Sequence, residues 1–574
     1  MERVLSRVDR EKHPVRSSYD PTTHRASWAL GSFALFLLIG FAIYGPALQG
    51  PFINDDHLYI VSHPYVGTAS LANIVEILDP NGAAKLYAVN YSPVALLIFM
   101  AERALFGDAT FAYHVVNVVF HAFNCSLFVT LLMRSGVPRS AAMMGGLIFA
   151  VHPANVEAVA WIFQLKTLAA FSFGMSALLW WRQRPGIATI LFALALLTKY
   201  LALPLIFVAA AFAWTRRGRP ENVHSGRWLG VWAVLGLLVT IPQVEAFTHG
   251  GAFEVAAFTD PFVHLRTVAA IGVRYIAMAL TGYGVAALHE PEPVVAWTNR
   301  WWLLSIPLGA VLLWRLTQSL RARREEGAWW VLAAASFGPI SQVFPFFYGM
   351  GDRYLYFILP GLIGGGLLYA GTFEPPTGGG SKQSLSIAGR FAAGFAVLMV
   401  VFFALQSRGR AILWSHPDYV YSDAARAYPR GSTALYIRAV KAAHSGDTQG
   451  AIAALREAER DRPLSHVRNI ANDPRLSALF DEPEFAEYIK EIATTRIELA
   501  RRGGYDDAYW LRSVGSAFEA LGEYDKAIEH YDRAIRLDAP NRSGVLLDLE
   551  RVMELRRRTR AGGSEHPATR PGGG

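Results

Sequence analysis

Two adjacent carboxylates directly follow the first long apolar run of the chain, in residues 52–57, which read Phe-Ile-Asn-Asp-Asp-His. A carboxylate beside hydrocarbon is costly, and in a membrane protein it usually marks a functional site. Either Asp55 or Asp56 can serve as a general base that takes a proton from a hydroxyl group, with Asn54 and His57 beside it in the substrate pocket. A solvated turn is the alternative interpretation, because Asn and Asp are also turn-forming residues.

A second group of polar residues follows an apolar run in residues 152–161, which read His-Pro-Ala-Asn-Val-Glu-Ala-Val-Ala-Trp. The proline predicts the end of a helix, or a kink in it, at this point. We expect His152 and Glu157 to line the same pocket as the paired aspartates. Lys166, a few residues further on, brings a positive charge that can bind phosphate.

Two further cations complete this set. Lys199 lies at the end of another apolar run, and Arg353 stands in a glycine-containing loop with Asp352 before it and Tyr354 after it. Together with Lys166, these cations can stabilise a phosphate leaving group while a carboxylate activates the acceptor. A charge pair between Asp352 and Arg353 that only fixes the membrane topology is the alternative.

Polar residues also recur inside one of the apolar runs. His114, Asn117 and His121 follow one another at helical spacing, and Tyr91 precedes this run in a Tyr-Ser-Pro segment. A polar residue on a membrane helix must face protein or a wet cavity. We expect Tyr91 and His114 to contact the substrate, and hydrogen bonding between helices is the alternative.

The sequence lacks the motifs that several other functions require. The chain has no glycine-rich phosphate loop ending in Lys-Ser/Thr and no His-Glu-x-x-His, which argues against soluble nucleotide hydrolysis and against a membrane zinc protease. The single cysteine, Cys125, lies in an apolar run and excludes an internal disulfide. The aspartate pair offers too few ligands to predict a metal ion. The net charge of +8 comes from short basic clusters between apolar runs, so no nucleic-acid partner is expected.

The elements that must position these residues are membrane helices. Hydrophobic residues make up 52% of the 574, and every backbone amide in hydrocarbon has to be satisfied within its own segment, which leaves only helices for the long apolar runs. The chain is therefore predicted to be all-α, with a polytopic membrane bundle of about eleven spans. The runs lie near 28–48, 110–133, 139–152, 168–183, 186–200, 201–215, 228–247, 302–316, 328–347, 355–372 and 387–407.

The charges between the runs predict how the bundle is oriented. The basic clusters near 3–16, 134–139, 182–184, 216–219 and 321–324 fall on one side, which the positive-inside rule makes cytoplasmic, with the N-terminus on that side. For this alternation, the interrupted stretches 93–106 and 265–288 must lie at the outer interface or re-enter. The candidate site residues then share the outer face.

The C-terminal part is polar and alanine-rich, and it carries a repeat pattern. Residues 511–540 place small and aromatic residues where a tetratricopeptide repeat packs two helices closely, and residues 446–463 fit the same spacing. We predict a basic tail at 1–26, a membrane domain at 27–410, a helical-repeat domain at 411–560 and a disordered tail at 561–574. The repeats can bind a protein partner or serve only as a cap or spacer.

The order of these motifs resembles the TMTC family of transmembrane and tetratricopeptide-repeat proteins. The shared pieces are Asn-Asp-Asp after the first run, His-Pro-x-x-Val-Glu-x-Val-Ala-Trp, Leu-Thr-Lys, Asp-Arg-Tyr-x-Tyr and the repeats. The resemblance implies a GT-C glycosyltransferase fold and an inverting transfer of a mannose-like sugar from a polyprenyl-phosphate carrier to a Ser or Thr hydroxyl.

Carried onto this chain, the resemblance makes Asp55 or Asp56 the catalytic base and implies that three cations bind the donor phosphate. These cations are Lys166, Lys199 and Arg353. Gln164 and Thr167 stand where the family often has acidic residues. The implied partners are the membrane lipid carrier, an acceptor protein or glycan and a protein on the repeats, and a bacterial inner membrane is the expected location.

Two other functions remain open at this stage. A transferase of the same fold can act on a lipid or polysaccharide acceptor instead of a protein. A non-catalytic assembly scaffold can recruit partners through its repeats, in which case the aspartates are dispensable.

Overall fold

The computed structural model describes residues 21–88, 90–217, 225–249, 260–343, 349–371, 387–461, 470–503, 508–537 and 542–560. The regular elements in these ranges are all helices, which confirms the predicted all-α class. The tail predicted at 561–574 and most of the basic tail predicted at 1–26 lie outside the described residues. The domain boundaries themselves stay predictions.

Eight helices in the described residues are long and apolar enough to cross a membrane. They are α1 (Pro21–Tyr44), α5 (Thr110–Arg134), α8 (Leu165–Trp180), α11 (Ser225–His249), α12 (Pro261–Thr281), α13 (Arg300–Arg321), α15 (Leu355–Gly371) and α16 (Ile387–Leu413). A ninth candidate joins α6 (Arg139–Ala150) to the turn at Pro153–Ala160, which includes α7 (Val156–Ala160), with a bend of 54°. The chain is an integral membrane protein.

The span count in the described residues is lower than the predicted eleven. Three of the predicted runs form helices of only 11 to 14 residues: α9 (Pro185–Thr198), α10 (Leu205–Thr215) and α14 (Glu326–Phe337). A bilayer core needs about 20 residues of helix, so none of these three crosses it fully as a straight helix.

The stretch 265–288 was predicted to lie at the interface because of its two arginines, but most of it belongs to α12, which meets the criteria for a span. The guanidinium of Arg266 donates to the carbonyls of Val294 and Val295 and lies 4.1 Å from the ring centroid of Trp297. The protein thus supplies partners that a lipid environment would deny to this charge. The other interrupted stretch forms α4 (Pro93–Phe106), which is not among the candidate spans.

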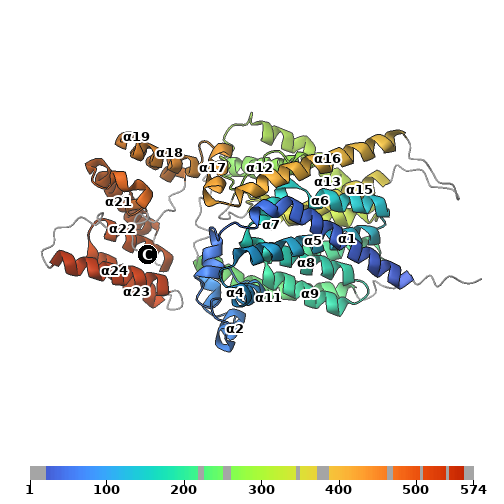
Figure 1. The fold of residues 1–574 in the computed structure, drawn as a ribbon, viewed down its shortest axis with the longest axis horizontal. Helices are drawn as coiled ribbons and strands as arrows, with labels where there is room; N and C mark the ends of the chain where they lie inside the picture. The colour runs from blue at the N-terminus through green and yellow to red at the C-terminus, as the bar shows by residue number, and fades with distance from the viewer. Residues whose placement is uncertain are drawn as a thin grey trace, which may run out of the picture.

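The membrane helices pack around α5, whose buried face includes Asn117, His121 and Asn124 (Figure 1). Helices α1, α6 and α8 pack against it. Helices α14 and α15 approach closely because Gly361 and Gly364 leave no side chain between them, and a Cβ on either would collide with α14. Between α1 and α4 lie the π-helical turn His57–Val61 and two short helices, α2 (Leu71–Leu78) and α3 (Ala84–Tyr87).

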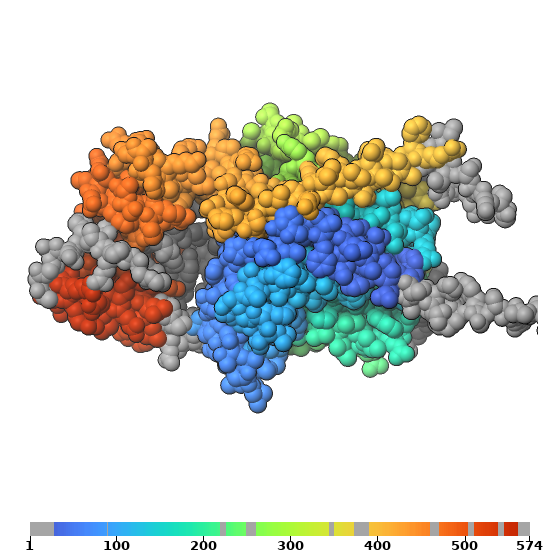
Figure 2. Space-filling model, viewed as in Figure 1, coloured from blue at the N-terminus to red at the C-terminus, as the bar shows by residue number. Residues whose placement is uncertain are grey.

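The C-terminal helices form two small hydrophobic cores at one end of the molecule (Figures 1 and 2). They are α18 (Ser432–His444), α19 (Thr448–Asp461), α21 (Pro483–Gly503), α22 (Ala508–Ala520), α23 (Tyr524–Leu537) and α24 (Arg542–Arg560). The preceding helix, α17 (Pro417–Ala427), packs through Val420 against the core of the membrane helices. Helix α18 pairs with α19 and α22 with α23. Tyr531 of α23 is fully buried, and a Cβ on Gly515 would come within 2.7 Å of its ring, which explains the small residue there.

Candidate functional site

The two aspartates lie in a tight turn that follows α1. Asn54 has φ 47°, a left-handed conformation that Asn tolerates better than most residues. Its side-chain oxygen accepts a hydrogen bond of 2.7 Å from the Tyr421 hydroxyl of α17. The turn places Asp55 and Asp56 in different surroundings although they are adjacent in the sequence.

Asp56 is fully buried, and both of its oxygens accept backbone hydrogen bonds. Oδ2 accepts from the N–H of Ile53 at 2.8 Å, and Oδ1 accepts from the N–H of Phe163 at 2.7 Å. Burial raises the pKa of Asp56 to about 8, against the opposing effect of these two bonds. The carboxyl group therefore joins the first loop to the turn at Ile162–Gln164.

Asp55 instead lies among charged side chains. Burial raises the pKa of Asp55, the positive charges of Lys166, Arg353 and Lys199 oppose this rise, and the negative charge of Glu157 adds to it. The described part of the chain donates no hydrogen bond to the Asp55 carboxylate. We call Asp55, Glu157, Lys166, Lys199 and Arg353 the charge cluster.

The two lysines of the charge cluster have no carboxylate as a hydrogen-bond partner in the described residues. The Lys166 ammonium lies 3.8 Å from the ring centroid of Phe163 and 4.6 Å from that of Tyr59, which are cation–π distances. The Lys199 ammonium donates to Thr167 Oγ1 at 2.6 Å and to Gln164 Oε1 at 3.5 Å. Both partners of Lys199 are neutral, and burial together with the nearby positive charges of Lys166 and Arg353 lowers the pKa of Lys199 well below its usual value.

Arg353 is held by a carboxylate, and its neighbour Asp352 is held by a histidine. Glu157 pairs with the guanidinium of Arg353 and also accepts its backbone N–H at 2.7 Å. Asp352 accepts from His289 Nε2 at 2.7 Å and from the N–H of Ala286 at 3.1 Å. The alternative of a charge pair between Asp352 and Arg353 is absent from the described contacts, because each has another partner.

Tyr354 adjoins the charge cluster, whereas four other predicted pocket residues are engaged with backbone groups. The Tyr354 hydroxyl accepts from Arg353 Nη2 at 3.3 Å. His57 is exposed, and its ring nitrogen lies 3.1 Å from the Phe52 carbonyl. The Tyr91 hydroxyl donates to the Leu78 carbonyl at 2.9 Å, and the rings of His114 and His152 lie 3.2 Å and 3.1 Å from the carbonyls of Gly50 and Ala279. No described hydrogen bond or ion pair joins these four to the charge cluster, and their place in the pocket stays a prediction.

The structure adds residues that the sequence did not single out. Tyr59 and Phe163 supply the ring faces against Lys166, and His289 supplies the partner of Asp352. No local signal marks His289, because its role depends on a residue far away in the sequence. The described residues contain no group of three or more His, Cys, Asp or Glu side chains that could hold a metal ion.

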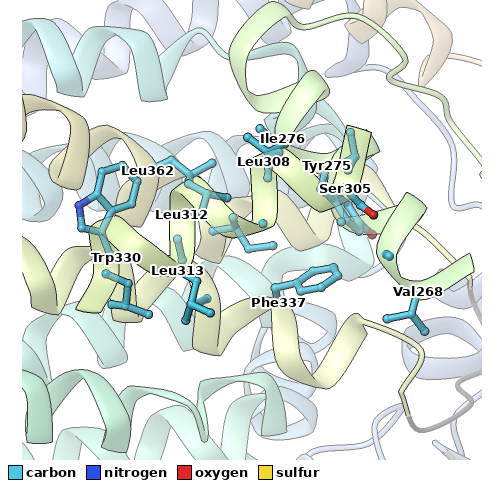
Figure 3. A pocket seen from close by; sticks show the side chains of 18 residues that line it. Val268, Tyr275, Ile276, Ser305, Leu308, Leu312, Leu313, Trp330, Phe337 and Leu362 are labelled. Atoms are coloured by element: carbon cyan, nitrogen blue, oxygen red, sulfur yellow. The ribbon is translucent and has the colours of Figure 1, made fainter. Parts of the chain in front are cut away.

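An apolar cavity of about 440 Å³ lies among α12, α13, α14 and α15 (Figure 3). Its lining includes Ile276, Leu308, Leu312, Phe337 and Leu362. Its volume is in the range of ligand sites in proteins.

One residue connects this cavity to the loop that carries Arg353. Tyr275 lines the cavity, and its hydroxyl accepts from the N–H of Gly351 at 3.0 Å and donates to the Gly351 carbonyl at 3.3 Å. Ile358 of the lining stands little more than one helical turn after Tyr354 on α15. The cavity and the charge cluster are therefore neighbours.

Comparison with known proteins gives a repeat family and a set of named relatives. The family model described as "Tetratricopeptide repeat" matches residues 420–466 and 493–542, which confirms the predicted repeats. The chain is 33% identical over 142 residues to the mouse (Mus musculus) "Protein O-mannosyl-transferase TMTC1" and 36% identical over 151 residues to the human (Homo sapiens) "Protein O-mannosyl-transferase TMTC2". It is 30% identical over 178 residues to the "Protein O-mannosyl-transferase F38B6.6" of Caenorhabditis elegans.

These matches cover 23%, 25% and 29% of this chain and 14%, 17% and 26% of the respective relatives. The chain thus matches only a minor part of the length of these curated relatives. No solved structure matches the chain. The similarities and the repeats together confirm the resemblance to TMTC proteins that the motifs indicate.

The two aspartates should differ in their effect on stability. Asp56→Asn replaces one carboxylate oxygen by an NH2 group, which cannot accept the N–H of Ile53 or of Phe163, and an unsatisfied buried donor costs about 1–3 kcal/mol. Because the pKa of Asp56 is raised on folding to about 8, its contribution to stability is fully present below pH 3.8 and declines as the pH rises towards 8. Thermal unfolding in detergent should therefore show the largest deficit of Asp56→Asn at acidic pH.

Asp55→Asn is the matched comparison, because no backbone donor depends on the Asp55 carboxylate. Its unfolding midpoint should stay close to that of the wild type. Equal destabilisation by both substitutions would contradict the separate roles of the two carboxylates.

Proposed function

We propose that this TMTC-like membrane protein is a glycosyltransferase that moves a mannose-like sugar from a polyprenyl-phosphate carrier to a Ser or Thr hydroxyl of a protein, with inversion. The proposal rests mainly on one observation. A carboxylate that accepts no hydrogen bond from the described residues lies among three cations, beside an apolar cavity in the membrane helices. The names of the relatives, which are O-mannosyl-transferases, support the reaction type.

The base in this mechanism is Asp55. Its carboxylate takes the proton of the acceptor hydroxyl while the hydroxyl oxygen attacks the anomeric carbon of the sugar. The bond from that carbon to the carrier phosphate breaks on the opposite side, so the configuration inverts. Asp56 is the weaker candidate, because both of its oxygens already accept backbone N–H groups.

The leaving phosphate is stabilised by the three cations of the charge cluster. A lipid-linked phosphate beside Lys166 and Lys199 would favour the protonated forms of both lysines, and their positive charges would in turn stabilise the leaving phosphate. Glu157 holds Arg353 in place through both its guanidinium and its backbone N–H. The neutral partners of Lys199 leave that cation available for an anionic ligand.

The carrier chain would lie in the apolar cavity among α12, α13, α14 and α15 (Figure 3). Burying isoprenoid units there is favoured by about 25 cal/mol for each Å² of apolar surface removed from water. Tyr275 then stands between the chain and the Gly351 backbone at the entrance to the charge cluster. A bacterial inner membrane with the site on its outer face stays part of this proposal, although the alternation of basic clusters does not carry it, because α12 meets the criteria for a span.

Asp55→Asn tests the catalytic base. Loss of a positioned general base lowers the rate by about 10²–10⁴-fold, whereas donor binding should change little. The measurement is mass spectrometry of hexose on Ser and Thr peptides in a deletion strain complemented with each variant. Asp108→Asn, at an exposed carboxylate far along the loop, serves as control. Full glycosylation by Asp55→Asn would rule out this base, and a phenotype that depends only on the repeats would favour the scaffold function.

The pH profile tests whether the cations act on Asp55. The positive charge of Lys166 lowers the pKa of Asp55, so Lys166→Met should raise that pKa. The base works only when ionised, and the acid limb of kcat/KM should therefore move to higher pH. The exposed Lys441→Met in α18 should leave the limb unchanged. A limb that stays in place in Lys166→Met would show that this lysine does not face the base.

Gly309→Phe tests the site of the carrier chain. Gly309 lines the cavity and has open space around its missing Cβ, so a phenyl ring there fills the cavity without a clash at the Cβ. We expect a higher KM for a donor with a long polyprenyl chain and an unchanged KM for a donor with a chain of two isoprene units. An equal effect on both donors would place the chain elsewhere.

A further inference from the structure

The first helices of the repeat segment are fastened to the segment that follows α12. Asp423 of α17 forms an ion pair with Arg410 at 2.8 Å and accepts the N–H of Ala287 at 2.9 Å. Glu290 accepts from the Ser432 hydroxyl at 2.5 Å and from the N–H of Thr433 at 3.2 Å. These contacts dock the repeats onto the same chain segment that supplies His289.

Between these docking contacts runs a chain of three buried or half-buried side chains. The Tyr428 hydroxyl lies 2.7 Å from His289 Nδ1, and His289 Nε2 lies 2.7 Å from Asp352 Oδ1. A carboxylate accepts, so His289 Nε2 donates to Asp352, and in the tautomer with its proton on Nε2, Nδ1 accepts from the Tyr428 hydroxyl. Burial raises the pKa of Tyr428 to about 12, which keeps its hydroxyl protonated as this arrangement requires.

This series of hydrogen-bonded side chains ends at Asp352, one residue before Arg353. Asp352 is buried and feels the positive charge of Arg410, while the guanidinium of the next residue, Arg353, is paired with Glu157. His289 occupies one oxygen of Asp352 and the N–H of Ala286 occupies the other. As long as both oxygens are occupied, Asp352 does not compete with Glu157 for Arg353.

We infer that Tyr428 and His289 are positioning residues that link the repeat segment to the donor-phosphate site through Asp352 and Arg353. The inference rests on the proposed role of Arg353 in binding phosphate. Its consequence is that whatever shifts α17 and α18, such as a protein bound to the repeats, changes the affinity of the charge cluster for a lipid phosphate. The linkage is a hydrogen-bonded network in which His289 joins Tyr428 to Asp352, and Asp352 adjoins the charge of Arg353.

The docking contacts and the network can be separated by substitution. Tyr428→Phe removes the hydroxyl that His289 accepts from, together with its interaction with Arg274 of α12, and leaves Asp423 and Glu290 in place. Ser432→Ala removes one contact to Glu290, but the Thr433 N–H and hydroxyl still hold α18 on Glu290, and the network stays in place. Tyr436→Phe removes a tyrosine hydroxyl that bonds to Asp473 inside the repeats and touches neither.

The experiment uses the full chain in lipid nanodiscs with farnesyl phosphate as the probe. The first readout is its dissociation constant, and the second is hydrogen exchange at the backbone N–H of Arg353 and of Ala286. Loss of one hydrogen bond in the network corresponds to about a twofold to tenfold change in an equilibrium constant. We expect Tyr428→Phe to weaken farnesyl phosphate binding by about that factor and to speed exchange at both amides.

Ser432→Ala and Tyr436→Phe should match the wild type in both readouts. Unchanged exchange in Tyr428→Phe would overturn the inference, and so would an equal effect of Ser432→Ala, which would reduce the network to docking alone. If the wild type binds no farnesyl phosphate while Tyr428→Phe still speeds exchange at Arg353, the linkage stands and the proposed donor is wrong.

Discussion

The candidate site depends on the carboxyl group of Asp56. It accepts the N–H of Ile53 in its own loop and the N–H of Phe163 in a distant turn, and so it holds two parts of the chain together. Asp55 comes from the first part, and Lys166 comes directly after the second. Without this buried bridge, the adjacent aspartate would have no fixed position relative to the cations. Asp56 therefore has a structural role, because it fixes the position of Asp55 relative to the cations.

A second constraint is the free energy needed to bury charged side chains at the end of a helix bundle. The charge cluster gathers five ionisable side chains where low-polarity helices meet, and such charges are stable only when other groups solvate them. Glu157 does this for Arg353, aromatic rings do it for Lys166, and the amide and hydroxyl of Gln164 and Thr167 do it for Lys199. Only one of the three cations, Arg353, is paired with a carboxylate in the described contacts.

The same arrangement links three regions that the chain order separates. Tyr275 connects the apolar cavity to Gly351, His289 connects the repeat segment to Asp352, and Glu157 connects the bent pair of helices to Arg353. The short loop at 351–354 is therefore the point where lipid-facing helices, the repeats and the charge cluster meet.

The sequence by itself determined the helical class, the repeats and the polar candidates. Long apolar runs in a membrane can only be helices, small and aromatic residues at fixed spacing specify the packing of a repeat, and paired charges beside apolar runs are visible without a fold. The sequence could not decide which aspartate accepts no backbone hydrogen bond, since that depends on the N–H of Phe163. It also misjudged α12, because the partners of Arg266 lie at 294–297. Only tertiary structure brings such partners together, and a hydrogen bond between distant residues leaves no local pattern.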